Sequence, residues 1–373
     1  MERAQRVLSA TPLFDGHNDL PWVIRQYEAS PRDVNAYDLR TRTPGHTDIP
    51  RLRQGMVGAQ FWSVYIPFNA VEEGASKVQL EQIDIAKQVF RRYPDVFEET
   101  LTADAAVRAF RNEKIASVMG MEGGHAIENS LGALRAFFDM GARYLTLTHS
   151  ANIDWADSCC AAPEHNGLSA FGKEVVREMN RMGMLVDLSH VAFKTMHDAL
   201  DVSEAPVIFS HSSAYGVTAH PRNVPDDVLR RLPRNGGVVM VTFVPAFIND
   251  AVNEYSRRFA EERQITPVPR ATMDDVIRHI EHVRSVAGID HVGIGADYDG
   301  ISQVPVGLED VSTYPALFAE LSRRGWSEAD MRKLAGENVL RAWRQAEQVA
   351  TRLQRERGPS TATIEQLDGE RPR

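Results

Sequence analysis

Short apolar runs alternate with amphipathic stretches along most of the chain. Several runs are too short for helices and are rich in Val, Ile and Thr, which is typical of buried parallel strands. The eight runs are 11–16, 56–66, 115–121, 143–148, 183–189, 206–210, 237–244 and 291–296. Between them, apolar residues recur at spacings of three and four. This pattern predicts helices over 76–92, 130–140, 168–182, 273–287 and 327–348.

Alternation of strands and helices predicts an α/β fold with a parallel sheet. Eight candidate strands favour a closed (β/α)8 barrel, also called a TIM barrel, over an open doubly wound sheet. No Gly-x-Gly-x-x-Gly loop follows any run, which counts against a dinucleotide-binding domain. We expect one barrel domain over 1–350 with a polar insertion at about 245–271. Residues 351–373 are charged and contain few apolar groups, so a polar, flexible C-terminal tail is expected there.

Polar side chains follow six of the eight runs. The first run continues into Asp15-Gly16-His17-Asn18-Asp19, and the others end at the residues Glu122, His149, His190, His211 and Asp297. The carboxyl ends of barrel strands converge on one mouth, where active sites lie. The sequence therefore predicts that these imidazoles and carboxylates meet.

The spacing of these residues predicts a site for two metal ions. His17 and Asp19 are two residues apart, so an extended backbone would point both side chains the same way and toward one ion. His190 and His211 end neighbouring strands and could hold a second ion, and the two oxygens of Glu122 could bridge the pair. Imidazole and carboxylate ligands without a thiolate favour Zn²⁺, with Mn²⁺ or Fe²⁺ as alternatives. A single His at a strand end is more often structural. Six runs that end in a His or a carboxylate indicate a shared site.

Composition narrows the class of protein. The net charge is −9 and no dense Lys/Arg block occurs, which makes the chain a poor nucleic-acid binder. There is no apolar leader and no run of 18 apolar residues, so we expect no membrane partner and a cytoplasmic location. The two cysteines, Cys159 and Cys160, are adjacent, and a disulfide between neighbours would be strained. Reduced thiols are the simpler interpretation, with a redox role as the alternative.

At these positions the sequence resembles the membrane dipeptidase family, also called renal dipeptidases. The resemblance runs in order from about residue 11 to about residue 345, and its motifs are specific as a set. The matching stretches are Asp15-Gly16-His17-Asn18-Asp19-Leu20-Pro21, Met121-Glu122-Gly123-Gly124, Leu145-Thr146-Leu147-Thr148-His149, Asp187-Leu188-Ser189-His190, Pro206-Val207-Ile208-Phe209-Ser210-His211-Ser212, His220-Pro221-Arg222-Asn223-Val224, Gly295-Ala296-Asp297-Tyr298-Asp299-Gly300 and Gly336-Glu337-Asn338.

The resemblance implies a barrel of the metallo-dependent hydrolase type with two Zn²⁺ ions per chain. His17 and Asp19 would bind one ion, His190 and His211 the other, and Glu122 both. His149 and Arg222 would contact a dipeptide substrate, whose C-terminal residue the family accepts in the D-form, and Asp297 would bind substrate and transfer protons. A homodimer is the family expectation. Animal members are secreted, disulfide-bonded and lipid-anchored, and this chain looks more like a microbial, soluble member.

Two other classes of function stay open at this point. One is a barrel metallohydrolase that acts on a non-peptide amide, a β-lactam or a lactone, and the other is a metal-binding protein without activity. All five proposed ligand positions and Asp297 carry chemically competent residues, which favours an enzyme. The sequence does not indicate which dipeptide is preferred.

Overall fold

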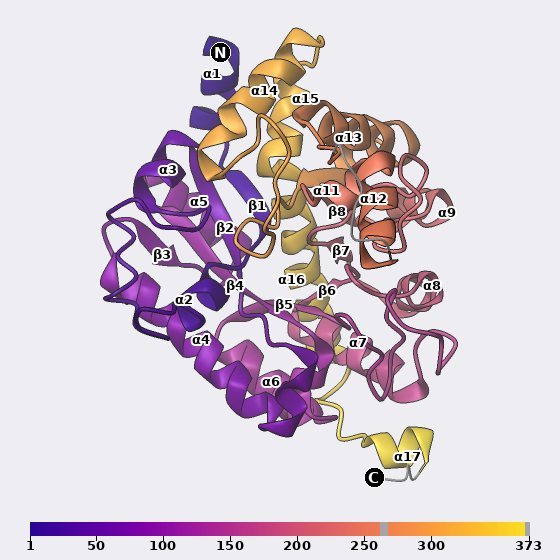
Figure 1. The fold of residues 1–373 in the computed structure, drawn as a ribbon. Helices are drawn as coiled ribbons and strands as arrows, with labels where there is room; N and C mark the ends of the chain where they lie inside the picture. Colours follow the sequence, from indigo (N-terminus) through magenta and orange to yellow (C-terminus); the bar gives the residue numbers. More distant parts are fainter. Residues whose placement is uncertain (262–267, 370–373) are drawn as a thin grey trace.

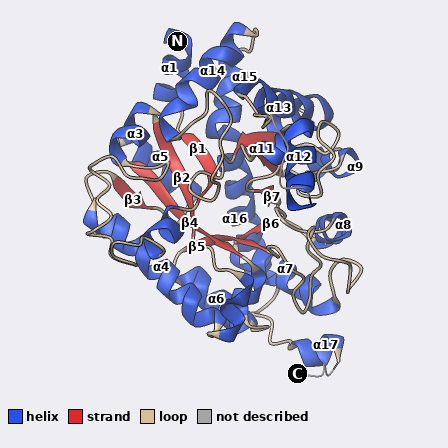
Figure 2. Cartoon of the chain, viewed as in Figure 1, coloured by secondary structure: helices blue, strands red, loops and turns tan. Residues whose placement is uncertain are grey.

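Eight parallel strands form a closed barrel at the centre of the molecule, surrounded by helices (Figure 1 and Figure 2). The computed structural model describes residues 1–261 and 268–369. The barrel strands pair in sequence order, and β9 returns to β1 to close the ring. They are β1 (Leu13–Asn18), β2 (Val57–Ser63), β4 (Ile115–Glu122), β5 (Ala142–Thr146), β6 (Leu185–Asp187), β7 (Ile208–Phe209), β8 (Val238–Val241) and β9 (Val292–Ile294).

Each of the eight predicted runs overlaps one of these strands, so the barrel prediction is confirmed. The strands are buried along their whole length, as expected where helices cover the outside and side chains fill the inside. A ninth strand, β3 (Phe97–Glu99), was not predicted. It pairs with the first residues of β4 and lies outside the ring, because β2 pairs directly with β4.

Helices cover the outside of the barrel. They are α1 (Glu2–Ala10), α2 (Leu20–Arg25), α3 (Ile49–Gln54), α4 (Ala75–Arg92), α5 (Ala103–Arg111), α6 (Leu131–Asp139), α7 (Ala170–Met182), α8 (Phe193–Val202), α9 (Asp226–Leu229), α10 (Leu232–Asn235), α11 (Pro245–Ile248), α12 (Asp250–Glu261), α13 (Met273–Ala287), α14 (Tyr314–Arg323), α15 (Glu328–Arg332), α16 (Asn338–Glu356) and α17 (Ile364–Asp368). Four of the five predicted helical segments begin and end within two residues of α4, α6, α7 and α13. The fifth, 327–348, is divided between α15 and α16, and α16 continues to Glu356. None of the helices in the described ranges has the length and hydrophobicity of a membrane span.

The amino-terminal half of the barrel interior is an apolar cluster. Phe14 of β1 stacks on Phe61 of β2, with ring centroids 4.7 Å apart. Trp343 of α16 is fully buried. Its ring centroid lies 6.3 Å from that of Phe14, which it meets edge-on, and 6.0 Å from that of Phe61, to which it is tilted. Other members from the strands and α16 complete the cluster. This end of the barrel is therefore filled by side chains and offers no opening to a substrate.

The insertion and the C-terminal segment contain helices that the sequence did not predict. The predicted insertion at 245–271 contains α11 and α12, and its residues 262–267 lie outside the described part of the chain. The predicted boundary at 350 falls inside α16, which continues to Glu356, and Leu353 and Ile364 are buried.

The end of the described chain docks on α7. The Asp368 carboxylate accepts hydrogen bonds from the Ser169 hydroxyl at 2.6 Å and from the Ala170 amide at 2.9 Å. A negative charge at a helix N-terminus is favourable. The segment expected to be a tail is therefore docked as far as residue 369. The buried side chains of Leu353 and Ile364 and the helix-capping Asp368 hold it, although its composition is mostly polar. Residues 370–373 lie outside the described range.

Candidate active site

The strand ends gather the predicted polar residues around one cavity of about 580 Å³ at the carboxyl-terminal mouth. The cavity is lined by seven of the eight predicted site residues, namely Asp19, Glu122, His149, His190, His211, Arg222 and Asp297. The eighth, His17, is 1 % exposed and lies beneath them. His17 belongs to β1 and Glu122 is the last residue of β4, whereas the others follow their strands by a few residues or lie on loops. All eight side chains therefore belong to one site.

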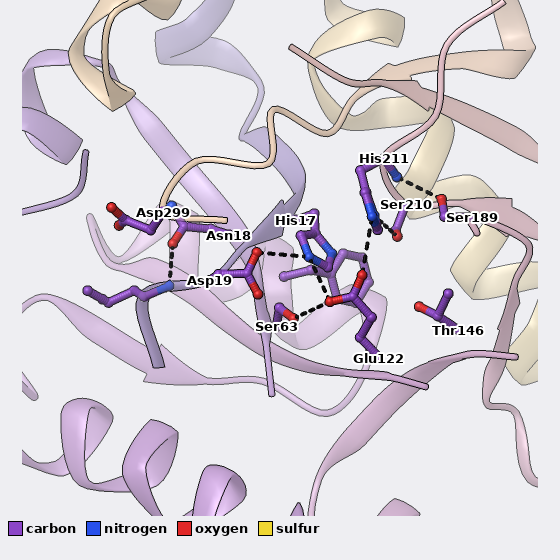
Figure 3. Close-up of polar contacts among 12 residues, drawn as sticks. His17, Asn18, Asp19, Ser63, Glu122, Thr146, Ser189, Ser210, His211 and Asp299 are labelled. Carbon is purple, nitrogen blue, oxygen red and sulfur yellow. Dashed lines mark hydrogen bonds and ion pairs between the residues drawn. The ribbon is translucent and has the colours of Figure 1, made fainter. Parts of the chain in front are cut away.

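The Glu122 carboxylate lies between two groups of ligand atoms. Its Oε2 is 3.3 Å from His17 Nε2, and its Oε1 is 3.0 Å from His190 Nε2 and 3.3 Å from His211 Nε2. Figure 3 shows His17 between Asp19 and Glu122, with His211 beside the other carboxylate oxygen. One carboxylate thus faces both groups, as a bridging ligand must.

Asp19 completes the group around His17. Its Oδ2 is 3.2 Å from His17 Nε2, and atoms of Asp297 lie within 4.8 Å of both. The predicted extended backbone is wrong in detail, because β1 ends at Asn18 and Asp19 is the N-cap of α2. Glycine at position 300 leaves room for both carboxylates, because a Cβ there would lie 2.3 Å from Asp19 Oδ2 and 2.5 Å from Asp297 Oδ1.

The chemistry of these atoms fits bound cations. Asp19 Oδ1 is buried without a hydrogen-bond partner, which is costly unless an ion or water satisfies it. The buried His17 Nε2 has carboxylate oxygens of Asp19 and Glu122 at 3.2 and 3.3 Å, a distance that leaves the three atoms free to share a cation. His190 Nε2 and His211 Nε2 face each other at 2.8 Å. Burial lowers the pKa of both imidazoles well below the usual value, so both are neutral, and the neutral form is the one that binds a metal. Nitrogen and carboxylate ligands suit Zn²⁺, Mn²⁺ or Fe²⁺.

A buried relay orients His211. His211 Nδ1 lies 2.8 Å from Ser210 Oγ, which in turn donates to Asp187 Oδ2 at 2.6 Å. Because the Ser210 proton goes to Asp187, Nδ1 of His211 donates to Ser210 and the Nε2 lone pair faces the cavity. In the sequence, Asp187 is marked only by the Asp187-Leu188-Ser189-His190 stretch, and its link to His211 depends on contacts that no motif shows.

A second contact orients His17. Its Nδ1 lies 2.9 Å from the Tyr144 hydroxyl, so Nε2 again faces the cavity. Tyr144 is fully buried, and its ring lies against residue 120. A Cβ at Gly120 would come within 2.0 Å of that ring, so glycine is required there. Partners of this kind fix the tautomer and direction of metal-binding histidines.

Asp297 and His149 face the cavity beside these groups. Burial and the charges of Asp19 and Glu122 raise the pKa of Asp297 well above its usual range. Asp297 and His190 also have left-handed φ values of 70° and 69°, a conformation that costs non-glycine residues energy and recurs at functional sites. The His149 ring packs on Tyr65 and His190, and burial lowers its pKa, so it is neutral.

Arg222 is 2 % exposed, so it is not an ordinary surface residue although it follows a proline in a loop. Its guanidinium donates to the His211 carbonyl at 3.1 Å and to Ser212 Oγ at 3.3 Å, and it lies 5.2 Å from the centre of the Phe247 ring. Phe247 also stacks on His220 at 4.3 Å. The result is a fixed cation at the edge of the cavity.

Some residues around the cavity were not identified from the sequence. Tyr65, Trp22 and Phe247 line it, and so does Asp299, whose carboxylate accepts the His46 amide at 2.6 Å. His46 had been assigned no role. The Asp297-Tyr298-Asp299-Gly300 motif was the only signal for Asp299. His125, close in sequence to Glu122, contacts the Pro67 carbonyl at 3.2 Å.

A barrel whose carboxyl-terminal mouth gathers buried imidazoles and carboxylates defines a metal-dependent barrel hydrolase. The sequence profile of the membrane dipeptidase family (peptidase family M19) matches residues 1–357. The chain belongs to this family and is a metallo-dipeptidase, so the resemblance deduced from the motifs is confirmed.

Solved structures agree with this assignment. The probable dipeptidase PvdM from Pseudomonas aeruginosa is 23% identical, with 94% of this chain and 98% of that chain covered and a TM-score of 0.83, and shows the shared fold. A metallo peptidase from Rhodobacter sphaeroides, liganded with a phosphinate mimic of the dipeptide L-Ala-D-Ala, is 27% identical, with coverage of 90% and 99% and a TM-score of 0.78. The dipeptidase AC, a family M19 metallo peptidase, is 28% identical, with coverage of 90% and 98% and a TM-score of 0.78.

Proposed function

We propose that this metallo-dipeptidase binds two Zn²⁺ ions and hydrolyses dipeptides with a free C-terminal carboxylate, including those with a D-residue at that position. His17 and Asp19 would hold one ion, His190 and His211 the other, and Glu122 both. The division of the two Glu122 oxygens between the two groups is the observation that carries this proposal. The ligand of the Rhodobacter relative, a mimic of L-Ala-D-Ala, supports the choice of substrate.

Bound ions would lower the pKa of water and polarise the scissile carbonyl. Around them, this chain's side chains divide the remaining tasks. Asp297 accepts a proton from the attacking water and delivers it to the leaving amine, a task suited to a buried carboxyl whose pKa is raised. His149 donates a hydrogen bond to the carbonyl oxygen as negative charge develops there. Arg222 pairs with the substrate carboxylate.

Metal analysis combined with turnover tests the proposal. Purified protein should contain two zinc ions per chain, lose activity to a chelator and regain it with Zn²⁺. Glu122→Gln should lose metal and activity, whereas Glu28→Gln, at an exposed glutamate, should lose neither. Full activity without metal would contradict the two-ion site.

A substrate panel tests the reaction. L-Ala-L-Ala and L-Ala-D-Ala should both be hydrolysed. If only lactones, β-lactams or other amides were turned over, the non-peptide alternative would replace the dipeptidase proposal. The homodimer and the cytoplasmic location stay predictions, which sedimentation velocity and cell fractionation would test.

A further inference from the structure

Cys159 and Cys160 have no role in the proposed reaction, yet they lie beside its machinery. They belong to the segment between β5 and α7 that also carries His149. Both thiols are free, with Sγ atoms 3.1 Å apart; Cys160 is exposed and Cys159 is half-buried. They are the only cysteines in the chain, so all thiol chemistry of this protein belongs to this pair.

Backbone contacts connect the pair to two histidines of the site. The Cys159 amide donates to the His190 carbonyl at 2.8 Å, and the Ser158 hydroxyl donates to the His149 carbonyl at 2.6 Å. The Cys160 amide donates to Ser158 Oγ at 3.2 Å. Three consecutive residues thus hold the backbones of His149 and His190, and any rearrangement of the Cys159–Cys160 unit acts on both.

We propose that Cys159 and Cys160 are a redox-active dithiol that takes a low-molecular-weight disulfide as its co-substrate, and that closure of the pair lowers peptidase activity. The part concerning activity rests on the proposed roles of His149 and His190. The modification itself rests only on the geometry of the two thiols.

The reaction is two thiol–disulfide exchanges. The Cys160 thiolate, which solvent reaches, attacks the small disulfide, forms a mixed disulfide and releases one small thiol. Cys159 then loses its proton and attacks Cys160 Sγ, which releases the second small thiol. The protein loses two electrons and two protons, and the small disulfide gains both.

Closure requires movement of the chain. A disulfide bond is about 2.05 Å long, so the two sulfurs must approach by about 1 Å. Neighbouring Cα atoms are only about 3.8 Å apart, less than the usual separation across a disulfide, so the closed form is strained and readily reduced. Strain of this kind makes the closed disulfide easy to reduce again. It also acts on the neighbouring hydrogen bonds to the His149 and His190 carbonyls.

Intact-mass analysis tests the modification without reference to activity. The metal-loaded wild type, treated with oxidised glutathione, should lose the mass of two hydrogens and its reaction with iodoacetamide, and dithiothreitol should restore both. Cys159→Ser should instead accumulate a glutathione adduct on Cys160. An adduct on the wild type that never converts to the closed form would overturn the dithiol.

Kinetics test the effect on the site. Closure should lower kcat/KM of the wild type by at least about tenfold, since displacements on the order of 1 Å at catalytic groups are costly, and reduction should restore it. Cys160→Ser is the matched control, and its activity should not respond to oxidised glutathione. Closure with unchanged kcat/KM would overturn the coupling. If no dipeptide were hydrolysed by the reduced protein, the proposed function would fail while the mass result still stood.

Discussion

The two ends of the barrel are formed by the same strands but by different kinds of side chain. At the amino-terminal end, Phe14 and Phe61 pack with Trp343 in a cluster without charged members. Three residues beyond Phe14, β1 places His17 in a group of buried imidazoles and carboxylates. Side chains are buried at both ends, and most completely in the apolar cluster. At the first end burial removes apolar surface from water and stabilises the fold, and at the second it perturbs ionisation and leaves polar atoms without partners.

Tyr144 belongs to both ends. Its ring is part of the apolar cluster and packs 5.0 Å from Phe61, while its hydroxyl contacts His17 Nδ1. Stability and site geometry are therefore separable except where such a residue joins them. Substitutions at the two ends of the barrel test that separation.

Trp343→Ala should destabilise the fold by about 3–5 kcal/mol, more than a hundredfold in the folding equilibrium, because it leaves a cavity in a close-packed cluster. Denaturant unfolding measures this loss. The fraction that remains folded should keep its metal content and turnover number. Trp22→Ala, at the half-buried cavity wall, is the matched variant and should lose much less stability. Equal losses would contradict the division between the two ends.

Asp297→Asn should reduce turnover by at least about a hundredfold, because the amide keeps the shape of the side chain but cannot accept the proton. Thermal unfolding and metal content should stay near the wild-type values. Unchanged turnover would remove Asp297 from the mechanism. Loss of metal would instead identify it as a ligand, which its distance from His17 and Asp19 would allow.

Ser210→Ala should weaken metal affinity by roughly 10–100-fold, since it removes the group that orients His211. Competition with a metal-binding dye measures the change. Ser117→Ala provides the control from the other end of the barrel: this serine is equally buried in β4, and its hydroxyl contacts only the Ile115 carbonyl at 3.2 Å among the described hydrogen bonds. The comparison fails if both variants lose affinity alike.

Arg222→Met should lower kcat/KM on dipeptides by at least about tenfold, because a charged hydrogen bond contributes roughly 1.5–3 kcal/mol. Amidation of the substrate C-terminus should harm the wild type severely and the variant little. The two changes should therefore be non-additive in a double-mutant cycle. Equal hydrolysis of amidated and free dipeptides by the wild type would show that Arg222 does not bind the carboxylate.

The features that the sequence predicted correctly are those that hydrophobic periodicity and strand order determine. Alternating patterns located the eight strands, and polar residues after the strands converged because parallel strand ends must meet. The short strand β3 escaped because three residues, two of them acidic, carry no strand pattern. The roles of Tyr144 and Ser210 escaped for another reason: each depends on the direction of a side chain and on contact with a residue far away in the sequence, His17 for Tyr144 and Asp187 for Ser210.

Arg222 illustrates the same limit. In the sequence it follows a proline in a polar stretch, and only the family resemblance distinguished it from a surface residue. The structure buries it because α11, within the predicted insertion, supplies Phe247 against its guanidinium. The docked segment at 357–369 was missed because one apolar residue, Ile364, and one helix cap, Asp368, fix a segment whose composition is otherwise polar.

Closure of the barrel by the pairing of β1 with β9 has a consequence for biosynthesis. Asp15 and Ile294 are paired in the ring, and a ribosome adding about 5–20 residues per second needs roughly 15–55 s to make the chain between them. Until then the nascent sheet is open, and its unpaired edge strands are available to other chains. His17 and Asp297 also remain apart for that time. The emerging polypeptide can therefore acquire its apolar packing progressively, but the site is complete only after the last barrel strand and Asp297 have been made.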